Sequence, residues 1–228
     1  MKVLEKIISG DGQRKSRLHD EKGNLIPGRR LLRHGPLAFL TGIGRLIFGY
    51  RPVQPWISYS AARVLREHLT GTSRVLEFGS GMSTVWYARH AGEVCSVEDF
   101  RPWFDRVSQV LQARRLGNVR YGFAATPEEY SSYMCDDTRG FDLVMVDGSV
   151  RADCIRKAAH LVRPGGILYL DNSDKNSSSA TMTGDMRLAE ALALEFARSR
   201  RAEVCYFTDF APTQLFVQEG MLVRVPKH

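Results

Sequence analysis

The chain has 228 residues, of which 43% are hydrophobic and 25% are charged. These proportions are typical of a globular protein and exclude a collagen-like, fibrous or intrinsically disordered chain. The net charge of +7 is unevenly distributed, because residues 1–51 hold eleven Lys and Arg against four Asp and Glu, whereas residues 52–228 hold 21 of each. The sequence therefore predicts a basic N-terminal extension over residues 1–55 and a neutral domain over residues 56–228.

The cysteines and the apolar segments bear on the location of the protein. The four cysteines are 19 or more residues apart and form no CxxC pair, so we expect neither a zinc site nor a disulfide framework. Glu5 and Lys6 interrupt the apolar run that a signal peptide needs. The most apolar stretch, residues 34–44, is shorter than the ~20 residues of a membrane-spanning helix. We expect a cytoplasmic protein, with at most a peripheral membrane contact.

Regular elements are predicted only beyond residue 55. Up to that point Gly and Pro recur along the chain, and the apolar residues follow neither a helical nor a strand periodicity for long. Helical patterns follow over residues 61–69, 102–115, 150–162 and 185–199, and two further helices are expected to begin near Ser83 and at Thr126. A Pro-Gly-Gly turn is expected at residues 164–166. Apolar strands are expected over residues 74–78, 94–97, 119–122, 141–146, 167–170, 203–207 and 214–225. This alternation predicts a doubly wound α/β fold, with a mostly parallel sheet covered on both faces.

A glycine-rich turn follows the first predicted strand and opens the next helix. It reads Glu77-Phe-Gly-Ser-Gly-Met-Ser-Thr84. Its two glycines allow a tight turn and a close approach to a ligand, and the helix N-terminus offers free N–H groups. Thr84 stands where a dinucleotide fingerprint has its third glycine, and the acid before the turn suits a ligand with a cationic group. The alternative is a plain strand-to-helix turn. The candidate ligand-binding residues are Glu77, Gly79, Ser80, Gly81 and Ser83.

A second acid, Glu98, ends the next predicted strand, 21 residues after Glu77. An acid at this spacing and position can accept hydrogen bonds from both ribose hydroxyls of an adenosine. Each motif alone is weak evidence, because many strands end in a solvated acid. Together, at the correct strand ends, they indicate a nucleoside-containing cofactor.

These motifs, with residues 141–148 (FDLVMVDG) and 161–168 (LVRPGGIL), resemble the class I S-adenosylmethionine-dependent methyltransferases. The resemblance covers the chain from Trp56 onward and implies a seven-stranded sheet whose last strand is antiparallel. It implies that residues 79–81 contact the methionine part of S-adenosylmethionine and that Glu98 binds its ribose. The segment around Trp56 is similar to bacterial enzymes that modify small molecules or glycans. The implied function is methyl transfer, by O-methylation, to a small-molecule or glycan acceptor.

A third constellation combines Asp147 with Asp171 and Asn172, which follow two further strands. Two carboxylates and an amide oxygen are ligands that Mg²⁺ accepts, and the arrangement resembles the metal-dependent catechol-type O-methyltransferases. Those enzymes carry a lysine base three residues after the first acid, where this chain has Val150, and the adjacent Arg151 is a poor base. Asp147 is the predicted catalytic residue and a cofactor contact, with its role as base, metal ligand or sulfonium partner left open. The alternative for the other two is that they order the Ser-rich loop after them.

Several alternatives remain at this stage. An aminopropyltransferase, a nucleic-acid methyltransferase and a non-enzymatic cofactor-binding protein are rival functions. Residues 146–149 lack the Asn/Asp-Pro-Pro-aromatic motif of base-amino methylases, so we expect no nucleic-acid partner. The basic extension is a lid over the site, a membrane-surface segment or plain packing, and the oligomeric state is left open. The aromatic residues that can wall a cofactor or fill the core are Trp56, Tyr59, Trp103 and Phe104.

Overall fold

A computed structural model of the chain describes residues 13–175 and 185–227, so Ser177, Ser178 and Ser179 of the predicted Ser-rich loop lie outside the described residues. The described part is built on one seven-stranded sheet in the order β3-β2-β1-β4-β5-β7-β6. The strands are β1 (Arg74–Phe78), β2 (Glu93–Glu98), β3 (Val119–Phe123), β4 (Phe141–Val146), β5 (Val162–Leu170), β6 (Glu203–Phe210) and β7 (Val217–Arg224). The first five strands in this order, β3, β2, β1, β4 and β5, run parallel to one another. The strand β7 is antiparallel to both of its neighbours, β5 and β6. The predicted doubly wound sheet with an antiparallel last strand is confirmed.

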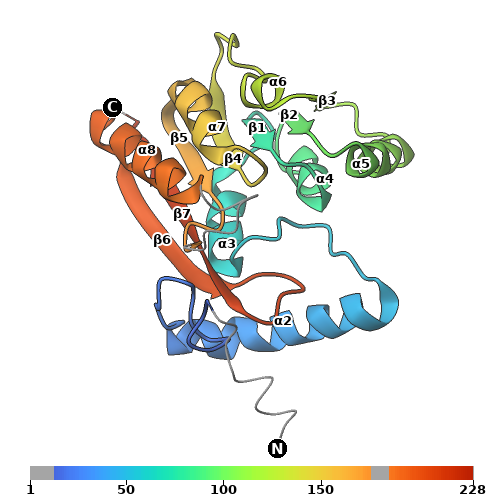
Figure 1. The fold of residues 1–228 in the computed structure, drawn as a ribbon. Coiled ribbons are helices and arrows are strands. Elements are labelled where there is room, and N and C mark those ends of the chain that lie inside the picture. The colour runs from blue at the N-terminus through green and yellow to red at the C-terminus, as the bar shows by residue number, and fades with distance from the viewer. Residues whose placement is uncertain (1–12, 176–184, 228) are drawn as a thin grey trace, which may run out of the picture.

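Helices cover both faces of the sheet (Figure 1). They are α3 (Tyr59–His68), α4 (Met82–Ala88), α5 (Arg101–Ala113), α6 (Pro127–Ser131), α7 (Arg151–Ala158) and α8 (Met186–Ser199). The alternation along β1 shows how the faces divide, because Val75 packs with α3 and α4 whereas Leu76 packs with α7 and α8. Both side chains are fully buried, as expected for a parallel strand between two helical layers.

The start of β5 differs from the sequence prediction. The expected helix over residues 150–162 ends at Ala158, a short 3₁₀ turn (Ala159–Leu161) follows, and the strand begins at Val162. The Pro-Gly-Gly stretch therefore lies inside β5, where the pairing with β4 shifts in register and Gly165 has a φ of +78°. Its place in the sheet has a tertiary cause, because the N–H of Gly165 donates to the carbonyl of Pro226 at 2.9 Å and the N–H of Val225 donates to that of Gly166 at 3.0 Å.

The N-terminal part contains a helix that the sequence pattern does not predict, α2 (Gly28–Phe48), which lies beside one end of the β6–β7 hairpin (Figure 1). Its glycines and Pro36 conceal the helical pattern, since both residue types disfavour a helix interior. Packing explains one of the glycines, because a Cβ on Gly42 would lie 3.0 Å from the side chain of Leu215. Among the described residues, no helix combines the length and the apolar character that a membrane span requires.

Residues 14–26 precede α2 and are held against β7 by buried charges. Arg14 pairs with Glu21 at 3.0 Å and donates to the carbonyl of Val217 at 3.4 Å. The carboxylate of Asp174 accepts from the backbone N–H of Glu21 at 3.1 Å and from that of Glu219 at 3.2 Å. The loop that follows β5 is thereby fixed between the N-terminal segment and β7.

Asp209 in β6 ties α2 and α3 to the sheet. Its fully buried carboxylate pairs with Nδ1 of His34 at 2.8 Å. The same oxygen accepts from the N–H and the Oγ of Ser60, at 3.0 and 2.6 Å, and the other oxygen accepts from the N–H of Phe210 at 2.8 Å. One side chain therefore satisfies donors on three elements.

We expect Asp209→Ala to lower the free energy of unfolding by roughly 3 kcal/mol, because it leaves several buried donors without an acceptor. Urea denaturation measures this change. The control is Asp105→Ala, whose carboxylate on α5 is half-exposed and pairs with Arg101 on the surface, and which should change the stability by less than about 1 kcal/mol. Equal effects of the two substitutions would contradict the anchoring role of Asp209.

Candidate active site

The candidate site begins where three adjacent parallel strands end. The first residue after β1, Gly79, donates its N–H to the carbonyl of Val97 at 3.1 Å. The first residue after β4, Asp147, donates to the carbonyl of Phe78 at 2.9 Å, and Asp171 after β5 donates to that of Val146 at 3.1 Å. These backbone bonds hold the three turns at one edge of the sheet, the edge at which open α/β folds bind ligands.

The turns after β1 and β4 touch through their backbones. Gly79 has a φ of +97°, a conformation that favours glycine, and a Cβ on it would lie 2.8 Å from the carbonyl group of Asp147. A side chain on Gly148 would collide in turn with Tyr130 and with Gly79. Glycine at both positions is therefore required by the fold itself.

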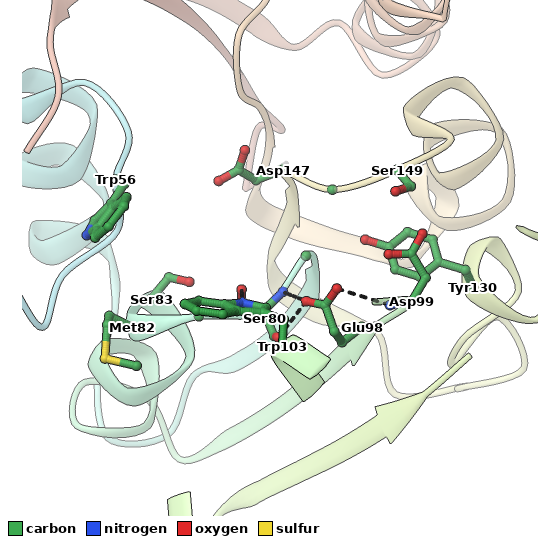
Figure 2. A pocket seen from close by; sticks show the side chains of 13 residues that line it. Trp56, Ser80, Met82, Ser83, Glu98, Asp99, Trp103, Tyr130, Asp147 and Ser149 are labelled. Carbon is green, nitrogen blue, oxygen red and sulfur yellow. Dashed lines mark hydrogen bonds between the residues drawn. The ribbon is translucent and has the colours of Figure 1, made fainter. Parts of the chain in front are cut away.

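A cavity of about 270 Å³ opens above this contact. Figure 2 shows the side chains around it, which come from the turns after β1, β2 and β4 and from the aromatic residues at its rim. The cavity brings together six of the predicted site residues: Gly79, Ser80, Gly81, Ser83, Glu98 and Asp147. Its further lining residues are Trp56, Met82, Asp99, Trp103, Tyr130, Gly148 and Ser149.

Gly81 differs from Gly79 in what its missing side chain leaves open. A Cβ on Gly81 would lie 3.7 Å or more from its nearest neighbours, which are Ser83 and Trp103 of the cavity lining. The protein alone therefore tolerates a side chain there, and the added atom would occupy cavity space. This is the arrangement expected where a ligand approaches the backbone closely.

Glu77 lies beneath the glycine-rich turn and is not among the residues that line the cavity. Its fully buried carboxylate accepts hydrogen bonds from three hydroxyls, those of Ser83 at 2.5 Å, Thr84 at 2.6 Å and Ser96 at 2.7 Å. Burial raises the pKa of Glu77 to about 7, although these three hydrogen bonds oppose the shift. Glu77 thus stabilises the glycine-rich turn and the first residues of α4 through hydrogen bonds on the side away from the cavity.

This burial predicts a pH-dependent stability. The pKa of Glu77 is 4.5 in the unfolded chain and about 7 in the folded protein. Between these two pH values the folded protein holds a proton on Glu77 that the unfolded chain releases. The free energy of unfolding therefore falls as the pH rises from 4.5 through about 7. The difference in free energy of unfolding between wild type and Glu77→Gln should therefore decrease by up to roughly 3 kcal/mol between pH 4.5 and 8. Urea denaturation of both proteins across this range measures it. A difference that does not change with pH would contradict the assignment.

Glu98 ends β2 with its carboxylate turned to the glycine-rich turn. One oxygen accepts from the N–H and the Oγ of Ser80, at 3.2 and 2.7 Å, and the other accepts from the N–H groups of Asp99 and Phe100, at 3.2 and 3.0 Å. Burial raises the pKa of Glu98, and these hydrogen bonds oppose the shift. Trp103 donates from Nε1 to the carbonyl of Ser80 at 2.8 Å, which fixes the same turn from the other side.

The predicted aromatic candidates divide into two pairs. Trp56 and Trp103 line the cavity, and the guanidinium of Arg51 lies 5.6 Å from the first ring and 5.2 Å from the second. Tyr59 instead packs into the cluster under α2, and Phe104 stacks on Tyr121 with a 4.6 Å centroid separation. Arg51 therefore joins the N-terminal segment to the rim of the cavity through two cation–π contacts.

Arg151 occupies the centre of the predicted metal constellation. Its side chain is almost fully buried, and its Nη2 lies 3.4 Å from both Oδ1 of Asp147 and Oδ1 of Asn172. It also donates from Nη1 to the carbonyl of Asp171 and from Nε to the carbonyl of Gly148, the latter at 2.9 Å. The sequence indicated only that this arginine lies nearby, and not that it joins all three predicted ligands.

Both acids of this constellation have a raised pKa. Burial raises the pKa of Asp171 well above its usual range, and the neighbouring charge of Asp147 adds to the shift. Burial also raises the pKa of Asp147, whereas the guanidinium of Arg151 opposes the change. The guanidinium of Arg151 favours the charged form of both carboxyl groups, although burial has the larger effect on each pKa.

This arrangement does not fit a divalent metal. The oxygen donors have the right chemistry for Mg²⁺, but a fixed guanidinium already contacts the side-chain oxygens of Asp147 and Asn172 and the backbone carbonyl of Asp171. A cation at the same place would face the positive charge of Arg151. In the ranges that the structure describes, no three His, Cys, Asp or Glu side chains converge to hold a metal ion.

Comparisons with known proteins add a decisive observation about the fold. The sequence matches no family model and no curated protein. Its structure is similar to that of an O-methyltransferase from Bacillus cereus in complex with S-adenosylhomocysteine, with 15% identity, a TM-score of 0.60 and coverage of 85% of this chain and 90% of the other. The chain has the fold of the class I S-adenosylmethionine-dependent methyltransferases.

The same fold serves different acceptors. The O-methyltransferase TomG from Streptomyces achromogenes, involved in tomaymycin synthesis and bound to S-adenosylmethionine, is 17% identical, with a TM-score of 0.57 and coverage of 83% and 89%. An rRNA methylase from Streptococcus thermophilus is 13% identical, with a TM-score of 0.54 and coverage of 78% and 98%. The likeness therefore establishes the methyltransferase fold and leaves the acceptor to be inferred from the site.

Proposed function

We propose that this chain is an S-adenosylmethionine-dependent methyltransferase that methylates a hydroxyl group of a small-molecule or glycan acceptor. The observation that carries the proposal is the cavity at the sheet edge, which unites the glycine-rich turn, Glu98 and Asp147. The surroundings of Gly81 support the proposal. Neighbouring backbone leaves no room for a side chain on Gly79, whereas Gly81 borders open cavity space where a ligand would approach the backbone.

Several of the cavity residues have a role in this proposal. S-adenosylmethionine, when bound, supplies a methyl group that is already activated for displacement, so the protein has chiefly to position the acceptor. Glu98 would accept hydrogen bonds from the ribose hydroxyls, and the turn from Gly79 to Gly81 would hold the methionine part. Trp56 and Trp103 would form apolar walls. Glu77, which lies under the turn, acts as a positioning residue instead of a direct contact.

Asp147 is the proposed base. Its side chain is 30% exposed and lines the cavity, so an acceptor hydroxyl can reach it. Burial raises the pKa of this carboxylate and so makes it more basic than a free one, and the guanidinium of Arg151 opposes the shift. The proton of the acceptor would move to Asp147 as the oxygen attacks the methyl group. Asp171 and Arg151 position this base and balance its charge without a metal ion.

The N-terminal extension, residues 1–55, is proposed to complete the cavity. Arg51 bridges Trp56 and Trp103, and Arg45 lies 5.0 Å from the Trp56 ring. These contacts place cationic groups at the rim, where they can meet an anionic acceptor. All four cysteines lie in the described part of the chain and are free thiols, in keeping with a reducing, cytoplasmic location.

The function is tested by incubating the protein with methyl-labelled S-adenosylmethionine and a panel of hydroxyl-bearing small molecules and glycans. We expect S-adenosylhomocysteine to accumulate together with an acceptor that gains one methyl group, which mass spectrometry places on oxygen. Methylthioadenosine as the product would instead identify an aminopropyltransferase. Failure to bind S-adenosylmethionine or S-adenosylhomocysteine would overturn the proposal.

Cofactor binding gives a first test at the level of residues. Glu98→Ala should weaken S-adenosylmethionine and S-adenosylhomocysteine alike, by roughly 1.5–3 kcal/mol, because the ribose is common to both and loses charged hydrogen bonds. Gly81→Ala should weaken both ligands while leaving the unfolding midpoint unchanged, since the added methyl group enters the cavity. Titration calorimetry measures the affinities. Asp105→Ala on the surface of α5 is the matched control, and unchanged affinities for Glu98→Ala would remove this residue from the site.

Metal removal gives a second test. We expect full turnover in excess chelator and no activation by added Mg²⁺, because Arg151 already supplies the positive charge at Asp147. Arg151→Gln should reduce turnover and move the acidic limb of the pH–rate profile to higher pH, since loss of the cation raises the pKa of Asp147. Loss of turnover in chelator, with recovery on addition of Mg²⁺, would show that a metal acts at this site after all.

A further inference from the structure

The helix α2 presents an apolar face that the rest of the described chain leaves uncovered. Its buried side consists of small residues, Ala38 and Gly42, which pack toward β6 and Leu215. The opposite side carries large side chains, most of them more than half exposed. They are Leu32 at 81%, Leu37 at 46%, Phe39 at 53%, Leu40 at 65%, Leu46 at 78%, Ile47 at 67% and Phe48 at 81%. A contiguous apolar surface of this kind marks an interaction site.

The charges around this face have one sign. The helix α2 contains four Arg and no Asp or Glu, and two of the four, Arg30 and Arg45, bond to Thr208 and Thr213. Arg29 and Arg33 are exposed on the first turns of α2 beside the apolar side chains. A helix with a broad apolar face edged by arginines is the pattern of a segment that lies in the plane of a membrane interface.

We propose that α2 docks this protein on the surface of an anionic membrane, with its apolar face among the acyl chains and with Arg29 and Arg33 at the phosphate groups of the lipids. A second copy of the chain fits the charges less well. A two-fold interface would set α2 against itself, so that arginines would face arginines in a segment without any acid to pair with them.

The placement of α2 gives the docking a direct connection to the cavity. The helix ends at Phe48, and the following residues lead within one short segment to Arg51 and then to Trp56 on the cavity lining. Docking would therefore hold one rim of the cavity close to the lipid surface. The inference itself rests on the exposed face and its charges and is independent of the methyl-transfer proposal.

Vesicle co-sedimentation of the full chain tests the docking. We expect binding to vesicles of phosphatidylcholine mixed with phosphatidylglycerol, weaker binding to phosphatidylcholine alone, and a decrease as salt rises, because exposed charges are screened beyond about 10 Å at 0.1 M. The triple variant Phe39→Ser, Leu46→Ser and Ile47→Ser should bind at least roughly tenfold more weakly. Since these side chains are exposed, its unfolding midpoint should remain that of the wild type.

Two matched controls separate the surface from general effects. Leu188→Ser removes a comparably exposed leucine from α8, at 48%, and should bind vesicles as the wild type does. Arg29→Gln with Arg33→Gln should weaken the salt-sensitive part of binding, whereas Arg114→Gln with Arg115→Gln, which removes the same charge from the exposed end of α5, should not. Absence of vesicle binding at low salt would overturn the proposal. So would a dimer in sedimentation velocity that the triple variant converts to monomer without any change in vesicle binding.

Discussion

The backbone contact between the turns after β1 and β4 is the constraint on which the candidate site depends. Gly79 and the Asp147–Gly148 peptide lie so close that neither glycine has room for a side chain. This contact sets the glycine-rich turn and the proposed base on one cavity wall. The carbonyl of Gly148 accepts a hydrogen bond from Arg151, which also donates to the carbonyl of Asp171. Arg151 therefore connects the turn after β5 to the turn after β4.

The acids at this edge of the sheet are stabilised in three different ways. Glu77 is surrounded by hydroxyl donors, Glu98 accepts from backbone N–H groups, and Asp147 is paired with a guanidinium. Hydroxyls and backbone groups keep a carboxylate in place without adding charge, whereas the guanidinium adds a fixed cation. The positive charge at the proposed base is thus part of the covalent chain, and its position is set by the packing of α7 instead of by the concentration of an ion.

The sequence contained enough information for the sheet and for much of the cavity. Apolar runs located the strands, and strand ends in a parallel sheet share an edge, so the chain order alone places Gly79, Glu98 and Asp147 together. The inclusion of residues 164–166 in a strand depends on backbone partners about 60 residues away, which no local pattern contains. The helix α2 was not predicted because its Gly42 is explained only by contact with Leu215, which is distant in the sequence. The central position of Arg151 was not predicted because its four partners come from two separate turns.

The contacts of the N-terminal segment also affect how the protein is made. Arg14 is bonded to Val217, 203 residues later in the chain, and His34 is bonded to Asp209. A ribosome adding roughly 5–20 residues per second needs on the order of 10–40 seconds to supply those partners. During that interval the N-terminal segment has neither a buried place for its charges nor a cover for the side of α2 that the folded protein buries. Completion of the native structure must therefore wait for the β6–β7 hairpin to leave the exit tunnel, and until then this segment is exposed to chaperones and to aggregation.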